Sequence, residues 1–280
     1  MARYKLIDWL IDWLIVAGEV ISMTQLNGVV YIVCRWLPAV LTFSLATHQR
    51  LEDVFILGWP VDVVACESTC MLYIAACDRR CVWRRSEDGE DVHVHCKLPA
   101  VLANIFDLSA ADFFVPYSLS VTSTGLLVML RGTRQLIEYY VDGSEFIRVQ
   151  LPDDMEPRYA VQSPTGTFIV SLYHWHLKRW QVVEVSTGGE VLRQFSGSRL
   201  TSLCSLTPHV AVDSHGNIFV ADRDNDCILL LDSHLSLRRV IIDEHQLNYK
   251  HPWRLCYREQ SGQLLVGLDD SVVLFDVLCR

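Results

Sequence analysis

No apolar run in the sequence is long enough to cross a bilayer. The nearest approach is MARYKLIDWLIDWLIVAG at the amino end, where Arg3 and Lys5 precede apolar residues as they do in a signal peptide. Asp8 and Asp12 interrupt this stretch, and its apolar run is far too short to span a membrane. We therefore expect no membrane partner, and a signal peptide is the less favoured interpretation of this segment.

The chain also lacks an excess of positive charge. It has 24 Lys and Arg against 33 Asp and Glu, a formal net charge of −9. This excludes attraction of the whole surface to nucleic acid or to an anionic membrane, although a local basic patch remains compatible with it. Hydrophobic residues make up 51% of the 280 residues and charged residues 20%, enough for a sizeable core and too apolar for a disordered chain. We expect no DNA partner.

The common catalytic and nucleotide-binding motifs are absent. The sequence contains no G-x-S-x-G, H-E-x-x-H, P-loop or G-x-G-x-x-G pattern. Asp222, Asp224, Asn225 and Asp226 lack the twelfth-position Glu of a calcium-binding EF-hand loop, and such residues suit turns that they stabilise by side-chain to backbone bonds. We expect no cofactor and no enzymatic activity.

Ten cysteines are present, in a spacing unlike that of any small disulfide scaffold. Several lie in apolar runs, where a thiol packs as a small hydrophobe, so we expect reduced thiols and a cytoplasmic protein. Zinc could use residues of one segment, namely Cys66, Cys70, Cys77, Cys81, His93, His95 and Cys96. Their spacing is looser than that of a zinc ribbon, and alternation along a hairpin would point several of them apart. We therefore expect no metal.

Short runs of Val, Ile, Leu, Tyr and Phe recur between Gly, Asp, Asn, Ser and Pro, which is typical of many short strands with tight turns. The most regular stretch is HVAVDSHGNIFVADRDNDCILLLDSHLSLRRVI, residues 209–241. It predicts four strands in succession, with the turn SHGN between the first two. No long helical period follows residue 20, so the sequence predicts an all-β fold.

This four-strand unit recurs about every forty residues, the length of a propeller blade. We predict six four-stranded antiparallel blades, near residues 20–57, 59–99, 117–152, 158–197, 208–243 and 251–280. They form a single domain over residues 1–280, with an insertion at 97–117. The alternatives are a pair of β-sandwiches and a WD-repeat propeller, and the sequence has no GH…WD signature.

The regular unit resembles an NHL repeat, as found in the C-terminal domain of TRIM-NHL-type proteins. The matching residues are Pro208, Val212, Asp213, Gly216, Asn217, Ile218, Val220, Ala221, Asp222, Asn225 and Ile228. The match is strong in this unit and weak in the other five, and Cys227 stands where the family has Arg. The resemblance implies a six-bladed β-propeller, and it implies RNA binding in some members of the family.

Closure of the ring assigns a role to the amino end. The last unit has three strands before the chain ends, so residues 1–19 should complete it. With a period of two, Ile7, Trp9, Ile11, Trp13 and Ile15 form one face of a strand, whereas with a period of 3.6 the acidic residues share one side of a helix. Ring closure favours the strand.

The connections between second and third strands carry the candidate binding residues. These are Arg35, Trp36, Arg79, Arg80, Arg131, Arg134, His174, Trp175 and Arg223. Arg interleaved with Trp suits phosphates and stacked bases, although strand connections are always polar and several Asp residues share this face. We expect a non-catalytic scaffold whose loops bind a protein partner, with RNA binding as the alternative. A metal-dependent, lactonase-like enzyme is the more distant alternative, because no Glu/Asn/Asn/Asp cage can be assembled from the inner strands.

Overall fold

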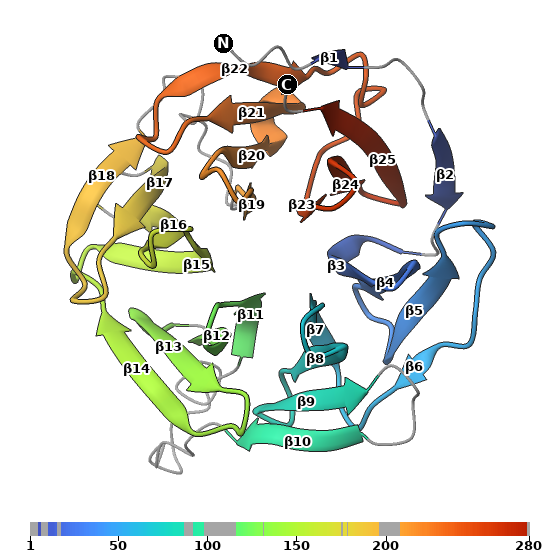
Figure 1. The fold of residues 1–280 in the computed structure, drawn as a ribbon, viewed down its shortest axis with the longest axis horizontal. Coiled ribbons are helices and arrows are strands. Elements are labelled where there is room, and N and C mark those ends of the chain that lie inside the picture. The colour runs from blue at the N-terminus through green and yellow to red at the C-terminus, as the bar shows by residue number, and fades with distance from the viewer. Residues whose placement is uncertain are drawn as a thin grey trace.

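The chain is an all-β, six-bladed β-propeller, as the sequence predicts. The computed structural model describes residues 5–6, 11–15, 18–86, 92–97, 116–130, 132–174, 176–177, 179–195 and 208–278. Figure 1 shows the six antiparallel sheets arranged as blades around a central axis. Most of the predicted insertion at 97–117 lies outside the described residues, and the single domain over residues 1–280 stays a prediction.

Each blade runs outward from an inner strand at the axis to an outer strand at the rim. Blade 1 contains β3 (Val20–Leu26), β4 (Val29–Cys34), β5 (Ala39–Ser44) and β6 (Val54–Phe55). Blade 2 contains β7 (Pro60–Cys66), β8 (Met71–Ala76), β9 (Cys81–Ser86) and β10 (Val92–Lys97). Blade 3 contains β11 (Pro116–Val121), β12 (Gly125–Leu130), β13 (Gln135–Tyr140) and β14 (Glu145–Gln150). Blade 4 contains β15 (Met155–Gln162), β16 (Phe168–His174), β17 (Arg179–Val185) and β18 (Val191–Phe195).

Blade 5 contains β19 (Val210–Val212), β20 (Ile218–Asp222), β21 (Cys227–Leu231) and β22 (Leu237–Ile242). Blade 6 begins with β23 (Arg254–Arg258), β24 (Gln263–Gly267) and β25 (Ser271–Leu278). The one helical element among the described residues is the three-residue 3-10 turn Arg223–Asn225. No helix in the described part of the chain has the length and apolar character needed to span a membrane.

The amino end completes blade 6, as ring closure predicts. Two short strands, β1 (Lys5–Leu6) and β2 (Ile11–Ile15), both pair antiparallel with β25. They follow one another along it, with Lys5 opposite Leu278 and Ile15 opposite Ser271. The first and last parts of the chain therefore share one sheet, which closes the ring (Figure 1).

The core consists of six apolar clusters, one at each interface between neighbouring blades. The second strands are buried along nearly their whole length because a blade lies against each of their faces. This explains their continuous apolar sequences, such as VVYIVC and IFVAD. The outer strands β14 and β18 are largely exposed and carry charged residues.

Glycines in two predicted hairpin turns allow adjacent blades to approach closely. Gly143 and Gly189 have φ angles of +86° and +88°, which L side chains rarely adopt. A Cβ on Gly143 would lie 2.3 Å from the carbonyl oxygen of His95, and one on Gly189 would lie 2.2 Å from that of Gln150. Each turn therefore packs against the outer strand of the preceding blade.

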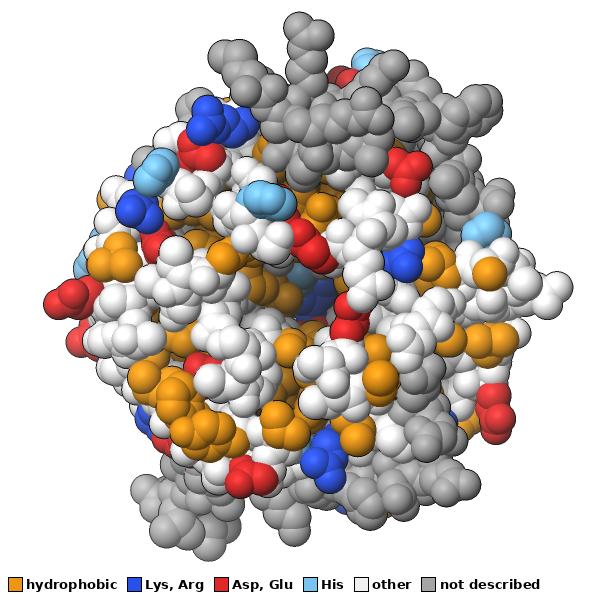
Figure 2. Space-filling view, in the orientation of Figure 1, with side chains coloured by type: hydrophobic (Ala, Val, Ile, Leu, Met, Phe, Trp, Pro, Cys, Tyr) orange, Lys and Arg blue, Asp and Glu red, His pale blue; other side chains and the backbone are white. Residues whose placement is uncertain are grey.

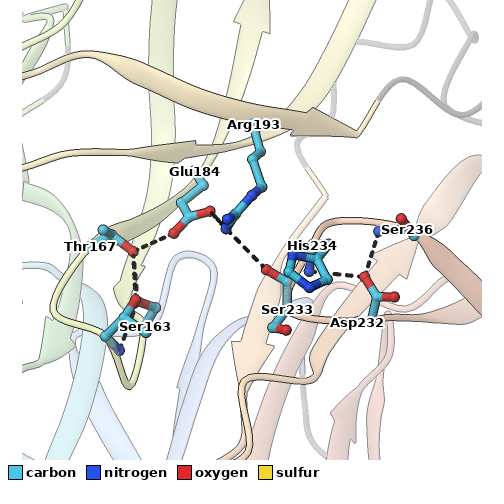
Figure 3. Close-up of polar contacts among 9 residues, drawn as sticks. Ser163, Thr167, Glu184, Arg193, Asp232, Ser233, His234 and Ser236 are labelled. Carbon is cyan, nitrogen blue, oxygen red and sulfur yellow. Dashed lines mark hydrogen bonds and ion pairs between the residues drawn. The ribbon is translucent and has the colours of Figure 1, made fainter.

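Polar contacts also link blades 4 and 5 (Figure 3). The buried carboxylate of Glu184 on β17 accepts a hydrogen bond of 2.8 Å from Thr167 Oγ1 and lies 2.6 Å from Arg193 Nη1. Arg193 in turn donates to the backbone oxygen of Ser233, in the turn between β21 and β22 of the next blade. Burying Glu184 is tolerated because these donors satisfy its charge.

The turn between β19 and β20 explains the regular sequence of blade 5. The carboxylate of Asp213 accepts hydrogen bonds from the backbone N–H of His215 at 3.0 Å and of Asn217 at 2.7 Å. The Asn217 side chain donates to the other carboxylate oxygen at 2.7 Å. In the next connection, Asn225 Nδ2 donates to Asp222 Oδ2 at 2.8 Å. These Asp and Asn residues stabilise turns, as predicted.

Candidate functional site

The first residues of the inner strands surround one mouth of the central channel. In β3, β7, β11 and β15, the register with the second strand shifts by one residue. Such a bulge leaves one residue unpaired and redirects its side chain. The residues at these shifts are Ile21, Val61, Tyr117 and Arg158. Together with Pro208 and Trp253 from blades 5 and 6, they line a cavity of about 200 Å³, which we call the mouth cavity.

The wall of the mouth cavity is basic and aromatic. Its remaining lining residues are Arg35, Tyr159, His209 and Arg254, so among the described residues three arginines and no carboxylate line it. This distribution contrasts with the net charge of −9 of the whole chain. The mouth cavity is therefore a place where an anionic group would meet arginine and aromatic side chains.

A buried ion pair lies immediately behind the mouth cavity. Arg254 Nη2 is 3.0 Å from Asp62 Oδ1, and the Asp62 side chain is only 1% exposed. Asp62 also accepts hydrogen bonds from Ser22 Oγ, from Val63 N at 3.0 Å and from Leu119 N at 2.7 Å. Residues of four inner strands thus meet at one carboxylate, whose charge and hydrogen-bonding capacity are both satisfied.

Tyr159 and His209 occupy the other side of the channel at the same level. Their ring centroids are 3.8 Å apart, and Leu255 N donates a hydrogen bond of 3.2 Å to His209 Nδ1. Burial, with the nearby Arg254 charge, holds the pKa of His209 well below its usual value. Burial raises the pKa of Tyr159. At neutral pH both rings are uncharged, and His209 carries its proton on Nε2.

These groups divide the channel into two compartments. A second cavity of about 180 Å³ continues along the inner strands and shares Tyr159, His209 and Arg254 with the mouth cavity. We call Ser22, Asp62, Tyr159, His209 and Arg254 the channel belt. Figure 2 shows the hollow at the centre of the ring, with hydrophobic and basic side chains inside it and acidic side chains at its edge.

Sequence reasoning missed the channel belt, because its members come from five different blades. A usable signal was present, since Asp62 and Arg254 are charged residues near the starts of predicted inner strands, where apolar residues predominate.

The predicted arginines lie in the connections between second and third strands, and several pair with a nearby carboxylate. Arg35 Nε is 3.1 Å from Glu19 Oε2, and Arg79 Nε is 3.6 Å from Asp78 Oδ2. Arg134 Nη1 is 2.5 Å from Asp153 Oδ1. The basic charge of these connections is thus interspersed with acidic charge. Of the predicted residues that the structure describes, only Arg35 lines the mouth cavity.

Two other predicted residues serve local structure. His174 Nε2 is 3.3 Å from Asp154 Oδ2, and its Nδ1 accepts a bond of 3.4 Å from Leu177 N. The polar sequence around Arg223 suggests an exposed side chain, but the side chain is only 18% exposed. Its guanidinium lies 3.5 Å from the centroid of the Trp253 ring. Arg131 and Trp175 lie outside the described residues, and Arg80 is in the β8–β9 turn of blade 2.

Apolar side chains are exposed next to the mouth cavity. Trp36 is 82% exposed, and it follows Arg35 in the β4–β5 turn of blade 1. From the end of β6 to the start of β7, alternate residues are exposed, with Phe55 at 69% and Leu57 at 68%, followed by Trp59. We call Trp36, Phe55, Leu57 and Trp59 the apolar track. Of these, sequence reasoning identified Trp36, and the alternation in FILGW was the signal for the others.

Hydrogen bonds hold the backbone of the apolar track in place. Trp59 N donates to Asp78 Oδ1 at 2.7 Å, and Trp83 Nε1 donates to Leu57 O at 3.2 Å. Trp36 has a φ of +67°, a conformation that costs a non-glycine residue about 1–3 kcal/mol. Apolar side chains presented on a fixed backbone lose little entropy when a partner binds.

The cysteines of blade 2 lie too far apart to share a metal. Cys66 and Cys70 flank the β7–β8 turn, whereas Cys77 and Cys81 flank the β8–β9 turn. The six residues of β8 separate the two pairs by about 20 Å. Among the residues that the structure describes, no three His, Cys, Asp or Glu side chains are grouped to hold a metal ion. His93 and Cys96 have no described side chain.

No protein-family model and no curated protein sequence matches the chain. Solved structures do resemble it. A protein of unknown function from Bacteroides thetaiotaomicron has 14% identity over 94% of this chain and 70% of its own, with a TM-score of 0.66. A catalytically inactive virginiamycin B lyase from Staphylococcus aureus, solved with quinupristin, has 11% identity over 99% of this chain and all of its own, with a TM-score of 0.63.

A third similar structure is YCF48 bound to the D1 peptide, with 12% identity over 92% of this chain and 77% of its own, and a TM-score of 0.57. At these identities the likeness shows the propeller fold alone.

Proposed function

We propose that the chain is a non-catalytic scaffold that binds a protein partner on the face bearing the mouth cavity and the apolar track. The observation that carries the proposal is the apolar track itself, four large apolar side chains exposed on a backbone that hydrogen bonds fix in place. Solvent-exposed aromatic clusters of this kind are typical of protein-binding surfaces.

The chemistry of the channel supports a non-catalytic role. Asp62 already binds Arg254, Ser22 and two backbone N–H groups, so it has no capacity left for a substrate or a metal. The neutral His209 ring lies tilted against Tyr159 and accepts a backbone hydrogen bond through Nδ1. The likeness to virginiamycin B lyase concerns the fold, whereas YCF48 is a propeller of similar shape with a bound peptide.

We further infer that the propeller is NHL-like. The Asp213 and Asn217 bonds give a physical reason for the D-S-x-G-N pattern of blade 5, because both residues are needed to satisfy the turn. A reducing compartment such as the cytoplasm is consistent with the free thiols of Cys34, Cys66, Cys70 and Cys256.

The test is a crosslinking pull-down with the purified full chain, in which bound protein and bound RNA are quantified separately. The variant Trp36→Ser/Phe55→Ser/Leu57→Ser removes most of the apolar track. The control variant Phe146→Ser/Leu192→Ser/Leu237→Ser removes the same number of exposed apolar residues from the outer strands of blades 3, 4 and 5.

We expect a specific protein set to be captured by the wild type and the control and lost from the track variant. Equal capture by all three proteins would overturn the proposal, and so would recovery of RNA alone.

A further inference from the structure

The wall of the mouth cavity carries positive charge, because its arginines line the cavity and the carboxylates paired with them do not. Arg35, Arg158 and Arg254 line the cavity, whereas their partners Glu19, Glu156 and Asp62 do not. Asp62 instead lines the second cavity, on the inner side of the channel belt. Three guanidinium groups therefore border a space that no carboxylate of the described residues enters.

One of these arginines has an unused donor. Arg158 Nη2 is 2.8 Å from Glu156 Oε1, and the guanidinium lies 5.8 Å from the centroid of the Tyr117 ring. Its Nε is buried and has no hydrogen-bond partner. A buried donor without an acceptor is costly. The Arg158 side chain also lines the mouth cavity, where its positive charge would attract an oxygen anion.

The size of the mouth cavity limits what can enter it. At about 200 Å³ it is smaller than the sites that enclose drug-sized ligands, which span about 300–1,000 Å³. It accommodates a single side chain, with Ile21, Val61 and Pro208 available to pack against methylene groups. An acidic side chain matches both the volume and the charge.

The apolar track leads directly to this cavity. Trp59 is two residues before the lining residue Val61, and Trp36 follows the lining residue Arg35. Phe55 belongs to β6 at the rim and Val61 to the inner strand β7, so the chain between them runs from the rim to the mouth (Figure 1). A partner segment that lies on the apolar track would therefore place its following residues beside the arginines of the mouth cavity.

We propose that the mouth cavity binds the carboxylate of an acidic residue in a partner segment whose apolar side chains lie on the apolar track. This proposal rests on the proposed scaffold function and names the chemistry of the partner. Arg158 and Arg35 bind the carboxylate, while Arg254 keeps the channel belt closed beneath it.

The first experiment selects peptides from a phage-displayed random 12-residue library with the purified full chain. We expect enriched sequences that combine aromatic or aliphatic residues with a Glu or Asp at a fixed offset. Selection with Arg158→Met should lose the acidic preference and keep the apolar one, and selection with Trp36→Ser/Leu57→Ser should do the reverse.

The second experiment measures binding of one enriched peptide by fluorescence anisotropy. Changing its acidic residue to the amide should weaken binding about 10- to 100-fold, and Arg158→Met should cause a similar loss. The two changes together should cost no more than either alone, because they remove the same contact. Arg158→Lys should restore part of the affinity, and Arg35→Met provides a second variant should Arg158→Met fail to fold.

The control is Arg148→Met, which removes an arginine of the outer strand β14 that is paired with Glu145. It should leave binding unchanged, and thermal melting should show that all variants are folded.

The outcomes separate the two proposals. No enriched peptide would overturn the proposed function, and with it this inference. Enriched apolar peptides without an acidic preference, or with affinity independent of Arg158 and Arg35, would overturn the carboxylate site alone. Binding of free glutarate or inorganic phosphate without any enriched peptide would assign the mouth cavity to a small anion. It would overturn the proposal that the bound carboxylate belongs to a partner protein.

Discussion

At the scale of single residues, the Asp62–Arg254 pair is the most constrained contact of the channel. The pair is desolvated, with side chains 1% and 12% exposed, and the carboxylate also binds Leu119 N of a third blade. A buried pair of this kind contributes little net stability compared with an apolar pair, but loss of one partner leaves an uncompensated charge. Its role is to fix how the inner strands meet.

Replacement of Asp62 should therefore be severe. We expect Asp62→Ala to lower the free energy of unfolding by about 3–5 kcal/mol, because Arg254 stays buried without its counter-charge. Urea denaturation of the purified chain measures this change. Asp62→Leu/Arg254→Met should be closer to wild type than Asp62→Ala, since it removes both charges. As a control, Glu145→Ala breaks the exposed pair with Arg148 and should cost less than about 1 kcal/mol. Equal losses for Asp62→Ala and Glu145→Ala would contradict this account.

At the scale of elements, the two strands from the amino end determine how the ring closes. β25 is paired with β24 on one side and with β1 and β2 on the other. Without β1 and β2, a long apolar strand would become an exposed edge, which favours aggregation. Closure by pairing across the two ends of the chain makes blade 6 depend on both.

Deletion of residues 2–16 should lower the melting temperature by at least ~5 °C, because it removes the ladders on β25. Deletion of residues 2–4, which precede β1, should leave the melting temperature unchanged. Differential scanning calorimetry of both proteins gives the comparison. If the two deletion variants have the same melting temperature, β1 and β2 do not stabilise the ring.

The sequence predicted elements where local chemistry determines them. The turns VDGS and STGG required glycine at positive φ, and Gly143 and Gly189 adopt it. Their close approach to His95 O and Gln150 O was not predictable, because it depends on the neighbouring blade. At the amino end, the period of the sequence fitted a strand and a helix equally. The topological need to close the ring decided correctly between them.

At the scale of the whole molecule, repetition made the fold predictable and concealed the site. Six similar units could be recognised because each repeats the same order of strands and turns. The channel belt takes one residue from each of five blades. The apolar track takes residues from the β4–β5 turn, from the end of β6 and from the connection that follows it. Such sites depend on the position of each blade around the axis, which no local pattern encodes. The polar connections suggested a basic surface, whereas the structure pairs Arg35, Arg79 and Arg134 with carboxylates.

This mosaic of charge leads to an expectation about RNA. Binding of single-stranded RNA requires a continuous basic path along the phosphates, because affinity comes from release of counterions. The arginine–carboxylate pairs of these connections and the net charge of −9 interrupt such a path. We expect no binding of a labelled 20-nucleotide RNA of mixed sequence in fluorescence anisotropy at 150 mM salt and micromolar protein. A binding curve that weakens steeply with salt, and that Arg79→Glu/Arg80→Glu/Arg134→Glu abolishes, would instead establish this face as an RNA-binding surface.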